Sequence, residues 1–542
     1  MMAVKRASGI LLPLSSLPGK YGIGCFSGEA YRFIDFLKNA GQAYWQILPV
    51  GPTGYGDSPY QSFSAFAGNP YFLSLDALAR EGLLTEEEAA RASDPRGKAA
   101  QGQVDYEWLY HTRYPVLRKA FARWRKGGQA APFSFEEFVR ANAAWLLDFA
   151  LFMALKEANG GTGFREWERA VRMREAAAMA AAKQELREEI DFHMFLQYQF
   201  ELQWMALRAY ANENGIHIIG DIPIYVPADS ADVWANPELF QLHDDGSCRA
   251  VAGCPPDCFS ETGQLWGNPL YDWDAHRETG YAWWISRMRR CSALFDVVRI
   301  DHFRGFDQYY SVPAGSPDAC IGHWEKGPGI GLFHAIEKEL PGQAIIAEDL
   351  GFITDSVREL VQKTGYPNMK VLEFAFDARD SSGPENYLPF YYEKNCVVYT
   401  GTHDNETLVG WLDSILPEER EAVRAFTGLD GGPWAFNPRA DRAGSCVPEA
   451  VTSAAPDSGL PAIGRREETF RLARALVRAA MASVGDLCVI PMQDWLLLGN
   501  EARVNRPSTT GGNWIWRMEP DAADRELAAQ ILQMTKTYGR LP

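Results

Sequence analysis

Eight short apolar segments, each followed by Gly, Pro or polar residues, constrain the fold of this 542-residue chain more than any other feature. Continuous apolar runs of this length are typical of strands that are buried on both faces, as in a parallel sheet. Helix-like segments such as 30–39 and 354–364 lie between most of them. Because strand and helix alternate eight times, the sequence predicts an α/β protein with a closed (β/α)8 TIM barrel. The expected strands are Gly9–Leu12, Ala43–Val50, His217–Tyr225, Phe295–Asp301, Ala344–Glu348, Lys370–Phe374, Cys396–Thr402 and Leu487–Met492.

Uneven spacing between these strands predicts insertions into one barrel domain that spans residues 1–542. Residues 76–214 are rich in Ala, Glu, Arg and Leu, and we expect a mainly helical insertion that forms either a wall beside the barrel mouth or a packed appendage. Residues 226–290 should add an active-site loop and a further insertion between the third and fourth strands. Residues 428–464 are dense in Gly, Pro, Ser and Ala, which indicates an irregular insertion.

Charge and cysteine content narrow the range of partners and compartments. A net charge of -17 repels polyanions, which argues against nucleic acid as a ligand. The nine cysteines are odd in number and lack a framework spacing, so we expect reduced thiols in a cytoplasmic protein. Cys254 and Cys258 flank a Pro-Pro pair and leave a redox pair open, but no second Cys or His pair has the ligand spacing of a zinc site. We expect no bound metal, and no apolar run approaches the roughly 20 residues of a membrane helix.

Acidic residues stand where three of the expected strands end. Asp301 ends the fourth strand, Glu348 ends the fifth, and Asp404 follows the seventh. Because the carboxyl ends of barrel strands converge on one mouth, we expect these three side chains to lie close together. Cleavage of a glycosidic bond needs one carboxylate that attacks the anomeric carbon and another that protonates the leaving oxygen. A single strand-end acid would be better explained by a salt bridge, but the three together predict glycoside chemistry.

Neighbouring residues support different roles for these acids. Arg299 lies two residues before Asp301, hence on the same face of the strand, where its charge should keep Asp301 ionised. Glu348 needs a raised pKa to carry a proton near neutral pH. His403 could donate a hydrogen bond to a substrate hydroxyl, whereas Asp221 could hold Arg299 or act directly.

Six stretches of the chain, in this order, resemble the 4-α-glucanotransferases, also called amylomaltases or disproportionating enzymes. They begin at Ser8 (SGILLPLSSLPG), Gly54 (GYGDSPYQ), Gly220 (GDIPIYV), Arg299 (RIDHFRG), Ala347 (AEDLG) and Gly401 (GTHDN). The resemblance implies a barrel enzyme that cuts an α-1,4-glucan, holds the donor piece covalently and passes it to the 4-hydroxyl of another glucan or of glucose. It implies no cofactor, because transfer between sugars needs neither a redox centre nor an activated phosphate.

The same resemblance assigns roles to individual residues. It implies that Asp301 is the nucleophile, Glu348 the acid/base and Asp404 the transition-state stabiliser. The loop that begins at Val251 resembles the family's active-site loop. The expected substrate-binding residues are Ser58, Tyr60, Asp221, Phe259, Gln264, Trp266, Arg299, His403, Asp349 and Asn505.

The chain departs from the family pattern near its end, where Arg-Met-Asn-Thr-Pro-Gly-Thr becomes Arg503-Val-Asn-Arg-Pro-Ser-Thr. Two other classes stay open on the residues alone. A retaining α-glucan hydrolase of the amylase type would share every catalytic residue. A non-catalytic glucan-binding protein would keep the aromatics but would usually lose one acid. The pattern does not separate a monomer from a homodimer.

Overall fold

The computed structural model describes residues 6–54, 56–94, 103–128, 130–256, 260–351, 353–377, 384–429, 462–509 and 511–542. Eight strands close into a barrel in the order β1-β12-β11-β10-β9-β6-β3-β2, and all neighbours are parallel. The predicted (β/α)8 class is therefore confirmed. The barrel strands are β1 (Ala7–Leu11), β2 (Tyr44–Gln46), β3 (His217–Ile222), β6 (Val297–Ile300), β9 (Ala344–Ala347), β10 (Asn368–Val371), β11 (Cys396–Tyr399) and β12 (Leu487–Pro491).

All eight strands differ in their bounds from the sequence prediction, most by one to three residues at an end, and two of the differences have a clear local cause. The second was expected over Ala43–Val50, but β2 has only three residues, and after Ile47 donates to Ile219 the chain reaches Pro49, which has no N–H to extend the ladder. The sixth was expected over Lys370–Phe374, but β10 begins and ends earlier because Leu372–Ala375 turn into the 3-10 helix η7. Apolar side chains from alternate strand positions, among them Leu11, Ile219, Val397 and Val489, form the barrel interior.

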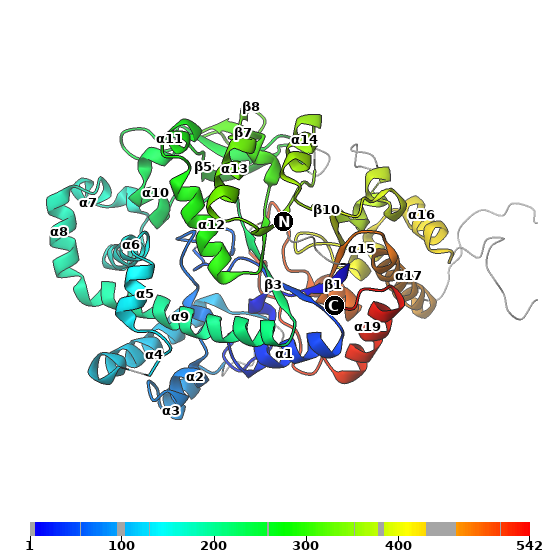
Figure 1. Cartoon of the computed structure of the whole chain (residues 1–542), viewed down its shortest axis with the longest axis horizontal. Coiled ribbons are helices and arrows are strands. Elements are labelled where there is room, and N and C mark those ends of the chain that lie inside the picture. Colours follow the sequence, from blue (N-terminus) through cyan, green and yellow to red (C-terminus); the bar gives the residue numbers. More distant parts are fainter. Residues whose placement is uncertain are drawn as a thin grey trace, which may run out of the picture.

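Helices cover the outside of the barrel (Figure 1). Their apolar faces bury Phe33 and Leu37 of α1 and Leu360 of α14, while charged residues face outward. The described chain begins and ends at the barrel wall, where Arg540 donates to the Ala7 carbonyl at 2.9 Å. The covering helices are α1 (Gly28–Asn39), α12 (Ala282–Leu294), α13 (Ile330–Glu339), α14 (Asp355–Thr364), α15 (Leu408–Ser414), α16 (Pro417–Thr427), α17 (Ala462–Ala482) and α19 (Arg525–Thr537).

Between β2 and β3 the chain forms a helical layer on one side of the barrel, coloured from blue through cyan to blue-green in Figure 1. Its longest helix, α9 (Arg187–Glu213), returns to the barrel, where the fully buried Trp204 donates to the Leu294 carbonyl at 2.9 Å. Thr85 and Ser134 begin two of the shorter helices with capping boxes. The other helices are α2 (Leu75–Arg80), α3 (Glu86–Ala90), α4 (Tyr106–Gly127), α5 (Phe135–Ala141), α6 (Leu146–Ala158), α7 (Arg169–Arg172) and α8 (Ala176–Glu185).

A second, antiparallel sheet of four strands was not predicted. Its order is β5-β4-β7-β8, and its strands come from both sides of β6 in the sequence. β4 pairs with β7 through Gly253 and Tyr310, so the sheet joins the loop after β3 to the loop after β6. Short helices α10 (Ala231–Ala235) and α11 (Trp273–Glu278) flank the β4–β5 pair in sequence. The strands are β4 (Ala250–Cys254), β5 (Gln264–Pro269), β7 (Gln308–Pro313) and β8 (His323–Lys326).

Most of the insertion expected at 428–464 lies outside the described residues. Within those that are described, no single helix has the length and apolarity to cross a membrane, and only the bent pair α5 and α6, with 100° between them, reaches these limits together.

Candidate active site

The three predicted acids follow the carboxyl ends of β6, β9 and β11, at one mouth of the barrel. Ile300 of β6 pairs with Ala347 of β9, so the next residues, Asp301 and Glu348, lie at the same level of the mouth. The backbone fixes both of them, because Asp301 donates to the Ile222 carbonyl at 2.9 Å and Glu348 donates to the Ile300 carbonyl at 3.1 Å.

Arg299 connects Asp301 with Asp221 of the neighbouring strand. Asp221 and Arg299 are register partners, both fully buried, and Arg299 Nη1 lies 2.7 Å from each oxygen of Asp221. The same nitrogen is 3.1 Å from Asp301 Oδ1. One guanidinium charge is therefore shared between two carboxylates, which compensates for their removal from water.

Tyr60 and His403 extend this network to Asp404. The Tyr60 hydroxyl donates to Asp221 Oδ2 at 2.7 Å and lies 2.8 Å from His403 Nε2. The two rings stack at 5.2 Å, and His403 Nε2 is 3.3 Å from Asp404 Oδ2. Asn505 donates to Asp404 Oδ1 at 2.6 Å, so both carboxylate oxygens are engaged. With Asp301, Arg299 and Asp221, the network brings together seven of the residues that the sequence predicts at the site.

The surroundings give the three acids different proton affinities. Desolvation, and then the charge of Asp301, raises the pKa of Glu348 to about 7, although Arg299 and the backbone N–H groups of His302 and Leu350 oppose this rise. Those N–H groups donate to Glu348 at 2.6 and 2.8 Å. Desolvation also raises the pKa of Asp301 to about 6, because it outweighs the lowering by Arg299. Arg299 therefore lowers the pKa of Asp301, as expected, but desolvation has the larger effect.

Asp404 has the opposite electrostatic environment. Desolvation favours its neutral form, but His403 and the Asn505 hydrogen bond together hold the pKa of Asp404 well below its usual range. In turn Asp404 raises the pKa of His403 against the effect of burial. The mouth therefore contains one carboxylate that stays charged and two that can exchange protons near neutral pH.

Four other predicted residues lie outside the hydrogen-bond network: two on β5, one in the turn before Tyr60 and one directed toward β10. Gln264 and Trp266 lie on β5, where the indole N–H donates to Gln264 Oε1 at 3.1 Å. Ser58 accepts the N–H of Tyr60 at 3.3 Å and so shapes the turn that presents this ring. Asp349 turns away from the network, because its carboxylate accepts from the Met369 N–H at 3.0 Å. Phe259 lies outside the described residues.

The sequence analysis missed His302, although it lies inside a stretch quoted for the resemblance. Its φ of 50° is left-handed, which is uncommon for a residue other than glycine and directs its N–H at Glu348. Burial lowers the pKa of His302 to about 3, so the ring is neutral, and it packs edge-on against Trp266 at 4.7 Å.

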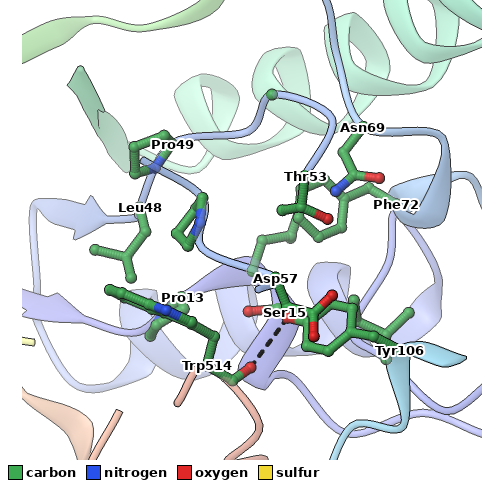
Figure 2. A pocket seen from close by; sticks show the side chains of 14 residues that line it. Pro13, Ser15, Leu48, Pro49, Thr53, Asp57, Asn69, Phe72, Tyr106 and Trp514 are labelled. Atoms are coloured by element: carbon green, nitrogen blue, oxygen red, sulfur yellow. Dashed lines mark hydrogen bonds between the residues drawn. The ribbon is translucent and has the colours of Figure 1, made fainter. Parts of the chain in front are cut away.

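Trp514 was also missed, and it borders a small pocket beside the network (Figure 2). Its ring lies 5.7 Å from that of Tyr60 and 6.0 Å from that of His403. Tyr106 closes the other side and donates to the Trp514 carbonyl at 3.0 Å. Trp514 lies far from the other site residues in the sequence, and its ring carries no charge or catalytic group, so the sequence pattern does not mark it.

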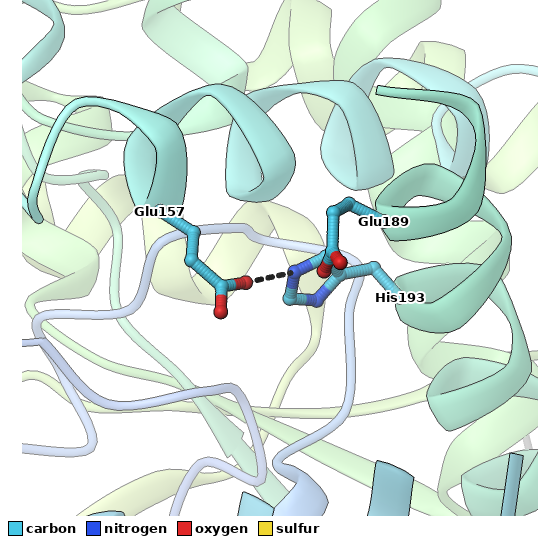
Figure 3. Close-up of side chains that lie close together, drawn as sticks. All are labelled: Glu157, Glu189 and His193. Carbon is cyan, nitrogen blue, oxygen red and sulfur yellow. Dashed lines mark ion pairs between the residues drawn. The ribbon is translucent and has the colours of Figure 1, made fainter. Parts of the chain in front are cut away.

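One group of side chains in the described part of the chain has the spacing of metal ligands (Figure 3). Glu157 of α6 and the pair Glu189 and His193 of α9 bring one ligand atom each to within 4.8 Å of one another. Arg118 of α4 already donates to both oxygens of Glu189, at 3.1 and 2.8 Å, and to Glu157 at 2.7 Å. Because this guanidinium neutralises the carboxylates, we interpret the group as a charge cluster that holds three helices together.

Comparisons with known proteins agree with this geometry. A model of the 4-alpha-glucanotransferase family matches residues 12–523. The 4-alpha-glucanotransferase of Thermus thermophilus is 45% identical over 544 residues, with 100% of both chains covered. That of Streptococcus pneumoniae serotype 4 is 44% identical, with 99% of this chain and 98% of the relative covered. The amylomaltase of Streptococcus agalactiae, solved in complex with acarbose, is 38% identical with a TM-score of 0.86 and covers 99% of this chain and 100% of its own. The chain belongs to the 4-alpha-glucanotransferase family.

Proposed function

We propose that this enzyme moves a segment of an α-1,4-glucan to the 4-hydroxyl of an acceptor glucan or glucose by a retaining double displacement. The observation that carries the proposal is the pairing of Asp301 and Glu348 at adjacent strand ends. Arg299 stabilises the charge of Asp301, whereas desolvation and the nearby Asp301 favour the protonated form of Glu348. Two carboxyl groups with separate proton affinities are what this chemistry requires.

In the first step, Asp301 attacks the anomeric carbon while Glu348 gives its proton to the departing 4-oxygen, which leaves as the shortened glucan. In the second step, Glu348 takes the proton of an acceptor 4-hydroxyl, and the acceptor oxygen displaces Asp301. The first step breaks a glycosidic bond and forms the ester bond to Asp301, and the second step breaks that ester and forms a new glycosidic bond. Glu348 gives up a proton in the first step and regains one in the second, so the enzyme returns to its starting protonation state.

Asp404 stabilises the oxocarbenium-like transition state in this proposal. Its low pKa keeps it charged through both steps, and Asn505 and His403 fix its orientation. A fixed anion beside a developing positive charge is more effective than one that must first turn toward it. Tyr60 and His403 then present their polar atoms to hydroxyls of the same sugar.

Transfer, rather than hydrolysis, calls for an acceptor site that excludes water. Gln264 and Trp266 are held by the second sheet, and the Trp266 ring packs against His302, whose N–H donates to Glu348. An aromatic surface there would bind an acceptor ring and displace water from the glycosyl enzyme. The hydrolase alternative shares the acids but gains no advantage from such a surface. We further propose maltooligosaccharides as natural substrates and a cytoplasmic role in carbohydrate metabolism, which the buried free thiols of Cys25, Cys291, Cys396 and Cys488 favour.

The test is incubation with maltotriose, alone and with excess glucose, with products resolved by size and total reducing ends assayed. Transfer gives a ladder of shorter and longer maltooligosaccharides at constant reducing ends. A rise in reducing ends without longer products would establish hydrolysis. Absence of reaction in both tubes would reject maltotriose as a donor and remove the support for the proposal.

A further inference from the structure

A buried glutamate that the proposed mechanism does not use lies behind the segment that carries Asp404. Glu373 follows β10, in η7, and is only 4% exposed. Its N–H donates to the Thr400 carbonyl at 3.1 Å, which ties it to the end of β11. A Cβ built on Gly401 would lie 2.9 Å from Glu373 Oε1. The carboxyl group therefore packs directly against the peptide that leads from β11 to Asp404.

The surroundings of Glu373 favour its neutral form, although a side-chain hydrogen bond from Asn405 opposes this. Among the described residues, none forms a hydrogen bond with Oε1. Leaving a buried charged oxygen without a donor is costly, whereas a neutral acid carries its own donor and less charge. This contrasts with Asp494 of α18 (Met492–Trp495), also buried, which accepts from Thr400 Oγ1 at 2.6 Å and from the Leu408 N–H at 2.8 Å.

The charged groups that face Glu373 are mostly acidic. Asp494 faces it from α18 and Glu406 from the segment before α15, while Arg503, after the 3-10 helix η11 (Asn500–Ala502), provides the opposing charge. Arg503 is already engaged, because it donates to the carbonyls of Asp404 and Asn505 at 2.9 and 2.7 Å. Burial, then Asp494 and Glu406, raise the pKa of Glu373 well above its usual range.

We propose that Glu373 is a positioning residue which, as an uncharged carboxylic acid packed on Gly401, holds the Thr400–Asn405 segment so that Asp404 faces the reacting sugar. The role of Glu373 rests on the proposed function, because Glu373 positions Asp404, which stabilises the transition state in that proposal. An ionised Glu373 would place another carboxylate charge beside Asp494 and Glu406. The resulting repulsion would be relieved by movement of Gly401, which has no side chain to anchor it.

Two measurements test this role. The first is the infrared difference spectrum of wild type minus Glu373→Gln at pH 7, in which we expect the carbonyl stretch of a protonated carboxylic acid. It needs no substrate, so its outcome is independent of the catalytic proposal. A spectrum with only carboxylate bands would overturn the uncharged state of Glu373.

The second measurement compares kcat and KM for maltotriose disproportionation per folded protein, with near-ultraviolet circular dichroism as the check on folding. Gln keeps the shape and neutrality of the acid, so Glu373→Gln should stay within about twofold of wild type, whereas Glu373→Ala should lower kcat by at least about tenfold and change KM less. Glu393→Ala is the matched control, because Glu393 is an exposed glutamate of the same β10–β11 connection. A Gln variant as slow as the Ala variant would mean that the anion is required, and an Ala variant with wild-type kcat would exclude positioning. If all variants and wild type fail to disproportionate maltotriose, the proposed function fails and the infrared result still decides the state of Glu373.

Discussion

The rate of the first chemical step should depend on pH as a narrow bell, with one limb from each member of the Asp301 and Glu348 pair. The nucleophile must be charged, so activity is lost as pH falls through the pKa of Asp301, about 6. The acid must be protonated, so activity is lost as pH rises through the pKa of Glu348, about 7. Because the two groups interact, these limbs are apparent values of the pair.

The difference between the pKa values of Asp301 and Glu348 sets how steeply the activity falls on either side of the optimum. With limbs at about 6 and about 7, the productive protonation state is roughly 0.6 of the enzyme at pH 6.5 and roughly 0.09 at pH 5 or pH 8. We therefore expect kcat/KM to fall about sevenfold from the optimum to either of these pH values. A pair with the usual values of the free side chains, both near 4, would show no optimum in this range.

The assay is the initial rate of maltotriose disproportionation at low donor concentration and constant ionic strength, since kcat/KM reports the free enzyme. A glycosyl fluoride donor separates the limbs, because its leaving group needs no proton. In Glu348→Gln, the single-turnover burst of fluoride should keep the acidic limb and lose the alkaline one. Glu359→Gln, on the exposed face of α14, is the matched control and should retain both limbs with maltotriose. A flat profile between pH 5 and pH 8, or an alkaline limb that persists in the Glu348→Gln burst, would refute the assignment of these two roles.

Three further substitutions test the network. Asp301→Asn should lower turnover by at least about three orders of magnitude with an unchanged circular dichroism spectrum. The control Asp355→Asn, at an exposed aspartate, should leave turnover unchanged. Substantial activity of Asp301→Asn would exclude Asp301 as nucleophile. Asn505→Ala removes a charge-assisted hydrogen bond to Asp404 that is worth about 1.5–3 kcal/mol. Single-turnover rates should therefore fall roughly 10- to 100-fold. An unchanged rate would argue that the orientation of Asp404 does not matter for catalysis. Arg299→Met leaves buried Asp221 without its counter-charge and should lower the free energy of unfolding by about 3–5 kcal/mol in denaturant titrations; equal stability would mean that the ion pair is dispensable.

The barrel and its acids could be predicted because the signals are local. Each buried strand is a continuous apolar run, and the first polar residue after it marks the mouth. The period of two placed Arg299 beside Asp301, and the structure puts them 3.1 Å apart. The same period explains the different direction of Asp349: it is the neighbour of Glu348, so its side chain points the other way and bonds to β10.

Features that depend on contacts between distant segments could not be predicted. The second sheet joins β4 and β5, which precede β6 in the sequence, to β7 and β8, which follow it. Each of these strands contains Gly, Pro or polar residues and therefore gives no continuous apolar run. Trp514 reaches Tyr60 only because the chain returns to the mouth after β12. Glu373 looks in sequence like any polar residue at a strand end, and only packing on Gly401 distinguishes it.

The carboxyl groups around the mouth also show why residue type alone does not predict a role. Asp404 accepts from Asn505 and faces His403, and its pKa is low. Asp301 shares the charge of Arg299 with Asp221, which leaves its pKa intermediate. Glu348 has two backbone donors but faces Asp301, so its pKa is higher still, and Glu373 lacks a donor on one oxygen and faces two acids. Desolvation raises the pKa of all four groups, and the donors and charges around each one set the order among them. Altering one donor should therefore change the protonation of its partner before it changes the fold.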